Sequence, residues 1–220
     1  MILYAAAPMI PPRRLQVATF VLSFALALAA RAEPTDAVAV IDRFHATLLG
    51  VMKDAKALGV EGRLERLTPA MDQTWDFPTM SQRSLGPAWG KLDVEQRERF
   101  AKVFRGMILR TYATRFDGYT SESFETSGSE SSIAGTQIVR SVLHAPNEDV
   151  HLDYRMRQTS DGWRVIDVYL GGTVSELAMK RAEYTSVLER DGFDALVSAL
   201  ERKIADASGS VPASSDSLDK

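Results

Sequence analysis

The sequence predicts a fold of mixed class, in which helices, then strands, then helices follow one another along the chain. Three observations support this prediction. Apolar residues recur every three or four positions up to residue 116, alternate with polar residues between 122 and 170, and return to the helical period after residue 173. Glycine, proline and small polar residues separate these three regions.

Four helices are predicted in the N-terminal half, at residues 35–56, 64–75, 78–85 and 93–116. Thr35 or Asp36 is placed to cap the first helix, Pro69 is expected to interrupt the second, and Asp93 can cap the fourth. The fourth helix carries one continuous apolar stripe, with Arg110 among the basic residues on its other faces. This helix therefore requires a wide apolar partner surface.

Four strands are predicted at residues 122–129, 133–143, 150–158 and 163–170, separated by short polar turns. The third strand alternates charged and apolar residues, so that Asp153, Arg155 and Arg157 share one face. We expect these side chains to lie on the wetter face and to form ion pairs across strands. An acid–base site built from Asp153, Tyr154 and Arg155 is the alternative.

The fourth strand is apolar on both faces, which predicts a position inside the sheet. Strict alternation places Val165 on the face of Asp167 and Val168 on the opposite face. A buried carboxylate needs a partner, and Arg140, Arg155 or a capping backbone N–H could supply it for Asp167. The alternative is that Asp167 acts as a catalytic base.

Two more helices are predicted after the strands, at residues 173–190 and 193–207. Thr173 and Glu176 have the spacing of a capping box, and Gly192 is expected to end the first of the two helices.

Composition excludes several kinds of chemistry. The chain has 220 residues, 45% hydrophobic and 25% charged, which are ordinary globular proportions, and it has no cysteine. Thiol catalysis, cysteine–zinc sites and iron–sulfur clusters are therefore impossible. A net charge of −3 does not favour a nucleic-acid binder. The only histidines, His45, His144 and His151, are too few for a multi-histidine metal site.

No motif for nucleophilic catalysis, phosphate-binding loops, zinc or calcium is found in the sequence. We therefore predict that the chain is not an enzyme and that it has no cofactor. The methionines, which include Met71, Met80 and Met179, are either core residues or the lining of an adaptable apolar pocket.

The first 32 residues have the features of a secretory signal peptide. Two arginines precede an apolar stretch of 16 residues, Leu15–Ala30, and a small-x-small pattern ends at Ala32. The stretch is shorter than the about 20 residues that span a bilayer, which favours cleavage over the alternative, an uncleaved anchor. Met9 is an alternative start with a more usual charged region. Export of a chain without cysteine indicates a bacterial periplasm.

The remaining residues predict one domain and a short tail. Residues 33–207 have a length that fits a single domain. Residues 208–220 are small and polar, and they offer too little apolar surface to offset the entropy of ordering, so we expect a disordered tail.

Four stretches of the sequence are informative as a set: residues 76–89 (DFPTMSQRSLGPAW), 100–112 (FAKVFRGMILRTY), 150–157 (VHLDYRMR) and 163–169 (WRVIDVY). They resemble the MlaC family of periplasmic lipid-binding proteins, whose members are also described as toluene-tolerance or ABC-transporter auxiliary components. They occur in the family's order, and the resemblance spans roughly Val38 to Ile204. Residues 172–184 depart from the typical Asn-Tyr-Arg-type run. This segment, together with Tyr119, is more similar to the hopanoid-associated branch called HpnM.

The resemblance implies an α+β fold, with a curved antiparallel sheet of about four strands wrapped by N- and C-terminal helices around an apolar cavity. It implies a monomeric carrier that shuttles a hopanoid or a phospholipid between an inner-membrane transporter and an outer-membrane acceptor complex. We predict that about half of the following candidate pocket residues contact the lipid: Met80, Leu85, Trp89, Phe104, Met107, Ile108, Tyr112, Leu152, Tyr154, Met156, Val165, Tyr169 and Leu177. A non-enzymatic adaptor with a filled core and a lipid-modifying enzyme are the alternatives.

Overall fold

The computed structural model describes residues 36–209. Along the chain, helices both precede and follow the strands of one antiparallel sheet. The helices are α1 (Ala37–Lys53), α2 (Ala55–Thr74), α3 (Phe77–Leu85), α4 (Val94–Arg115) and α5 (Glu176–Gly209), with short 3-10 turns at Gly86–Lys91 and Ile133–Gly135. The strands are β1 (Ser123–Ser131), β2 (Thr136–His144), β3 (Asp149–Thr159), β4 (Gly162–Leu170) and β5 (Val174–Ser175), paired in that order. The predicted α+β class is confirmed, and the two-residue β5 adds a fifth strand.

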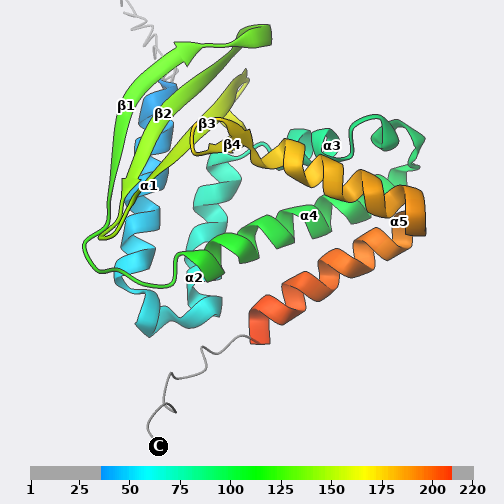
Figure 1. Cartoon of the computed structure of the whole chain (residues 1–220), viewed down its shortest axis with the longest axis horizontal. Helices are drawn as coiled ribbons and strands as arrows, with labels where there is room; N and C mark the ends of the chain where they lie inside the picture. Colours follow the sequence, from blue (N-terminus) through cyan, green and yellow to red (C-terminus); the bar gives the residue numbers. More distant parts are fainter. Residues whose placement is uncertain (1–35, 210–220) are drawn as a thin grey trace, which may run out of the picture. The chain divides into compact units, whose positions relative to one another are not determined.

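The helices lie on one side of the long, curved strands β1 and β2 (Figure 1). Helix α1 packs against β1 and β2, whereas α3 and α5 pack against β4. The predicted signal segment, 1–32, and residues 210–220 of the predicted tail lie outside the described residues. The prediction that the tail starts at 208 is wrong, because Ser208 and Gly209 still belong to α5. Within residues 36–209, no helix is both long enough and apolar enough to cross a bilayer.

Helix α4 is held by other helices. It packs closely against α2, α3 and α5, and among the described strands none comes as close to it. Arg63 Nε donates to the Ala113 carbonyl at 2.6 Å and its Nη1 donates to Ala55 O at 2.9 Å. Arg110, which we expected on a face other than the apolar stripe, is buried and pairs with Glu61 at 2.6 Å, because α2 covers that side of α4.

Several helix boundaries follow the predicted signals. The Asp36 carboxylate accepts from Val38 N at the start of α1. Asp93 and Gln96 form a capping box at the start of α4, with Gln96 N donating to Asp93 Oδ1 at 2.8 Å. A cap of this kind stabilises a helix by about 1 kcal/mol because it satisfies a backbone N–H that has no partner within the helix.

Two helix predictions are wrong. The helical turns of α2 continue through Pro69, which is exposed, so the carbonyl that it leaves unpaired, on exposed Glu65, can be hydrated. The break in α2 is instead at Gly59, whose φ of 59° ends one helical segment and starts the next. At the start of α5 the cap is Ser175, not Thr173, since the Ser175 hydroxyl accepts from Ala178 N at 2.9 Å.

A bulge corrects the predicted faces of β4. Val165 lies opposite Met156 and Val168 lies opposite Tyr154, with a register shift between them. Cross-strand partners share a face, so Val165 and Val168 lie on the same side of the sheet, with Asp167 on the other. Strict alternation could not reveal this, because one extra residue reverses the assignment for every position beyond it.

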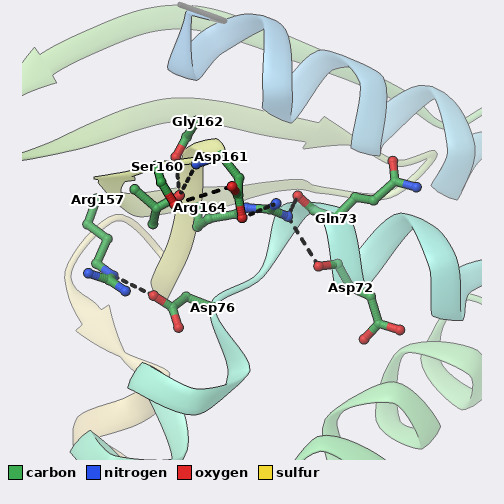
Figure 2. Close-up of polar contacts among 9 residues, drawn as sticks. Asp72, Gln73, Asp76, Arg157, Ser160, Asp161, Gly162 and Arg164 are labelled. Carbon is green, nitrogen blue, oxygen red and sulfur yellow. Dashed lines mark hydrogen bonds and ion pairs between the residues drawn. The ribbon is translucent and has the colours of Figure 1, made fainter.

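The β3–β4 hairpin is anchored to the junction between α2 and α3 (Figure 2). Asp76 N donates to the Val165 carbonyl at 2.9 Å, and the Asp76 carboxylate both caps α3 through Thr79 N and pairs with Arg157. Arg164 donates to the carbonyl of Gln73. These contacts fix the position of the segment that begins α3.

The expected ion pairs on the polar face of β3 form in part. Asp153 forms the predicted cross-strand pair, with Arg140 of β2 at 2.5 Å, but it is buried and not on a wet face as expected. The expectation is wrong for Arg157, which reaches Asp76 outside the sheet, and for Arg155, which donates to the Thr136 hydroxyl at 3.1 Å.

His45 joins α1 to the sheet. Its Nε2 lies 3.0 Å from the Tyr154 hydroxyl, and its ring stacks on Phe124 with centroids 4.2 Å apart. Burial lowers the pKa of His45 from 6.5 to about 4, and the nearby Asp42 opposes this shift only in part. The folded protein therefore favours the neutral ring.

The His45 environment predicts acid sensitivity. The unfolded chain binds a proton on this ring below pH 6.5, but the folded protein does so only near pH 4, so stability is full above pH 6.5 and is lost as the pH falls towards 4. Between pH 7 and 4.5 this single group should remove about 2–3 kcal/mol of unfolding free energy. Urea unfolding of the wild type and of His45→Gln at both pH values measures the difference.

The Gln side chain stays neutral and can still bond to the Tyr154 hydroxyl. His151→Gln, at an exposed position, is the matched control and should keep the wild-type pH dependence. Equal loss of stability in the wild type and in His45→Gln would contradict the assignment.

Candidate functional site

A cavity of about 90 Å³ lies between the sheet and the helices α3, α4 and α5. Its lining is mainly apolar, with charged groups contributed by α4, β4 and α5. The lining residues are Trp75, Met80, Phe104, Ile108, Thr111, Tyr112, Arg115, Phe116, Leu152, Asp167, Val168, Leu170, Glu176, Leu177 and Lys180.

The helical wall of the cavity comes from the apolar stripe of α4. Phe104, Ile108 and Tyr112 are spaced four residues apart, so they lie one above the other on a single face. Phe116 follows at the same interval, directly after the helix, and its ring lies 5.4 Å from that of Tyr112. Part of the apolar stripe that the sequence predicted therefore forms one wall of the cavity.

The opposite wall comes from the inner face of the sheet. Leu152 of β3 and Leu170 of β4 are cross-strand partners and share a face, and Val168 lies on the same face of β4. Met80 of α3 and Leu177 of α5 complete the apolar lining. Both side chains are buried.

Six of the predicted pocket residues line this cavity, and seven do not. Those that line it are Met80, Phe104, Ile108, Tyr112, Leu152 and Leu177. Those that the structure places elsewhere are Leu85, Trp89, Met107, Tyr154, Met156, Val165 and Tyr169.

The seven residues away from the cavity have other surroundings. Leu85, Tyr154, Met156 and Val165 are fully buried in the core, and Met107 is also buried. Trp89 packs edge-on against Phe100 in the turn after α3. Tyr169 lies opposite Asp153 and therefore on the other face of the sheet.

The lining residues that sequence reasoning missed fall into two groups. The apolar ones, Trp75, Phe116, Val168 and Leu170, continue patterns that were visible, since Phe116 belongs to the α4 stripe and the two β4 residues alternate with Asp167 and Tyr169. The polar ones are Thr111, Arg115, Asp167, Glu176 and Lys180. A search for apolar residues cannot find this second group.

Asp167 connects the end of β4 to the first turn of α5. Its Oδ1 accepts from Val168 N at 2.9 Å and from Leu177 N at 3.1 Å, and its Oδ2 accepts from the Ser175 hydroxyl at 2.6 Å. Of the three partners considered for this carboxylate, the capping backbone N–H is the one found. The connection holds Leu177 in the wall of the cavity.

Burial shifts the pKa values of two side chains that line the cavity, Tyr112 and Lys180. Burial is the main cause that raises the pKa of Tyr112 well above 10, so this phenol keeps its proton. Burial lowers the pKa of Lys180 from 10.5, and Glu176 opposes that shift. Within residues 36–209, no cluster of three or more His, Asp or Glu side chains is suited to hold a metal ion.

The cap formed by Asp167 predicts a loss of stability in Asp167→Asn. The amide loses the negative charge at the positive end of the helix dipole and turns one acceptor into a donor, so the unfolding free energy should fall by about 1–2 kcal/mol. Urea unfolding at pH 7 measures this fall. Asp117→Asn, at an exposed position, makes the same chemical change and should be nearly neutral. An Asp167→Asn protein as stable as the wild type would refute the capping role.

Comparisons with known proteins agree with this arrangement. The family model described as "MlaC protein" matches residues 42–202. A solved structure from Ralstonia solanacearum, described as a phospholipid-binding protein in complex with a phospholipid, is similar to this fold with a TM-score of 0.70. The two chains share 22% identity over 78% of this chain and 98% of the other, a level at which the likeness concerns the fold. No curated protein matches this sequence.

Proposed function

The chain belongs to the MlaC family, and on this basis we propose that it is a periplasmic lipid carrier that shuttles its cargo between an inner-membrane transporter and an outer-membrane acceptor. The observation that supports the proposal most directly is the apolar cavity between α4 and the sheet, with Ile108 and Leu152 on its opposite walls. A filled core, as expected for an adaptor that binds only protein, would have no such space.

The energetics of lipid transfer explain why a carrier needs this cavity. A two-chain lipid exposes on the order of 30 methylene groups, and each contributes about 0.8 kcal/mol when it is removed from water, or about 25 kcal/mol in total. A lipid therefore does not cross an aqueous compartment at a useful rate unless a protein covers its chains. The walls of this cavity are of the kind required, since aromatic and aliphatic side chains form most of them.

The cavity is small for a whole lipid. Its volume of about 90 Å³ is below the range of about 300–1,000 Å³ that is usual for ligand pockets. We therefore propose that its walls separate when the cargo enters. The α4 side suits this movement, because α4 packs against helices more closely than against the sheet, so its displacement away from the strands breaks no strand pairing.

Two classes of cargo are consistent with these features. The segment 172–184 resembles the hopanoid-associated branch, which favours a hopanoid. The similar structure from Ralstonia solanacearum is described as holding a phospholipid, which favours that class. Mass spectrometry of the lipid extracted from protein purified without detergent distinguishes them, and recovery of no lipid of either class would count against a carrier.

The carrier proposal predicts that a charge in the cavity removes the lipid. Ile108→Glu places a carboxylate against the acyl chain, so the lipid recovered per mole of protein should fall at least tenfold. Val94→Glu makes a similar change at an exposed position of the same helix and should retain the wild-type lipid load. Organic extraction followed by mass spectrometry gives both numbers.

A second variant separates loss of lipid from loss of folding. Thr111→Phe fills the cavity from the same helix without adding a charge and should also reduce the lipid load. A folded Thr111→Phe or Ile108→Glu protein, as judged by circular dichroism, that carries the full lipid load would show that the cargo binds elsewhere.

A further inference from the structure

The cavity has charged side chains at one end. Arg115 belongs to the last turn of α4, and Glu176 and Lys180 belong to the first turns of α5. Arg115 is exposed and also lines the cavity, so the cavity reaches the surface at this residue. Two cations thus stand where an apolar cavity opens to water.

The Arg115 guanidinium makes no hydrogen bond or ion pair with any described residue. Other arginines of this protein are paired, for example Arg105 with Asp72 at 2.6 Å and Arg99 with Asp194 at 2.6 Å. A guanidinium remains charged at all relevant pH values and presents a planar set of donors that fits a phosphate or carboxylate. Arg115 can therefore bind an anion without giving up an existing partner.

Lys180 is more deeply placed than Arg115 and is also incompletely paired. Its side chain is 20% exposed, and its Nζ lies 3.9 Å from Glu176 Oε2, which is too far for a hydrogen bond. No other described residue accepts a hydrogen bond from this ammonium group. A partly desolvated cation with free donors is stabilised by an anion that approaches it.

The groups next to the two cations indicate how an anion would be bound. The Tyr112 hydroxyl makes no hydrogen bond with any described residue, and it lines the same cavity as Arg115, on the same face one turn earlier in α4. The backbone N–H groups of Leu177 and Ala178, at the start of α5, are already used by Asp167 and Ser175. The anion must therefore be bound by side chains.

We propose that Arg115 and Lys180 bind the phosphate of a lipid head group, while the attached acyl chain occupies the apolar cavity beside Ile108. This inference rests on the proposed lipid-binding function and names the side chains that bind the head group of the cargo. Glu176 Oε2, 3.9 Å from Lys180 Nζ, leaves the ammonium donors free for the phosphate. Tyr112, one turn before Arg115, can donate to an oxygen of the same head group.

The experiment compares lipids with the same acyl chains and different head groups. Binding of phosphatidylglycerol and of diacylglycerol is measured for the delipidated wild type and for the double variant Arg115→Gln/Lys180→Gln. Because two charge-assisted hydrogen bonds are lost, the double variant should bind phosphatidylglycerol at least tenfold more weakly. Its affinity for diacylglycerol should remain within about twofold of the wild type, since that lipid has no phosphate.

The matched control is Lys102→Gln/Arg202→Gln, which removes the same two charges from exposed positions of α4 and α5 outside the cavity. This control should bind both lipids as the wild type does. The charge-retaining variant Arg115→Lys/Lys180→Arg should recover most of the affinity for phosphatidylglycerol. Equal weakening of both lipids in Arg115→Gln/Lys180→Gln, or weakening in neither, would overturn the assignment of the two cations.

A third ligand, inorganic phosphate, tests whether the two cations bind a lipid head group or a free anion. Inorganic phosphate at millimolar concentration should not displace phosphatidylglycerol from the wild type, because it lacks the acyl chain that supplies most of the binding energy. Displacement by inorganic phosphate at low concentration would overturn the inference in favour of a free-anion site. A wild type that binds neither lipid would refute the carrier function itself, whereas equal affinity for the two lipids would refute only the head-group site.

Discussion

The distance between α4 and the sheet is the constraint on which the cavity depends. Helix α4 is attached to α2 through buried Arg63 and Arg110 and packs against α3 and α5, so its apolar stripe cannot settle onto the strands. Collapse of this gap would bury more apolar surface, but it would break hydrogen bonds of buried guanidinium groups, and such a group left without a partner costs several kcal/mol. The hydrogen bonds of Arg63 and Arg110 between α2 and α4 thus help to keep the apolar cavity open.

The sequence predicted the secondary structure where periodicity and caps were strong, and it failed where a single residue decided the outcome. The α4 helix, with Asp93 as its cap, could be predicted because 22 residues repeat one pattern. The bulge in β4 could not be predicted, since Val165 and Val168 have side chains equally suited to either face. Pro69 was misread because its effect depends on whether the freed carbonyl reaches water, which is a property of the folded structure.

The candidate site was predicted only in its apolar part, and this limit has a physical cause. Phe104, Ile108 and Tyr112 could be chosen because helical spacing puts them on one face. Whether an apolar residue such as Met156 packs in the core or faces a cavity depends on its neighbours in space. Arg115 and Lys180 come from helices far apart in the sequence, so only the fold reveals that they stand at the same opening.

The hydrogen bonds of Asp167 give the cavity a mechanical property. One carboxylate joins the end of β4 to the first turn of α5, and the next turn of the same helix carries Lys180. Any displacement of this helical end therefore moves Leu177, in the apolar lining, and Lys180, at the opening, together. In the lipid carrier that we propose, this shared helical end couples the entry of an acyl chain to the position of the charged group at the opening.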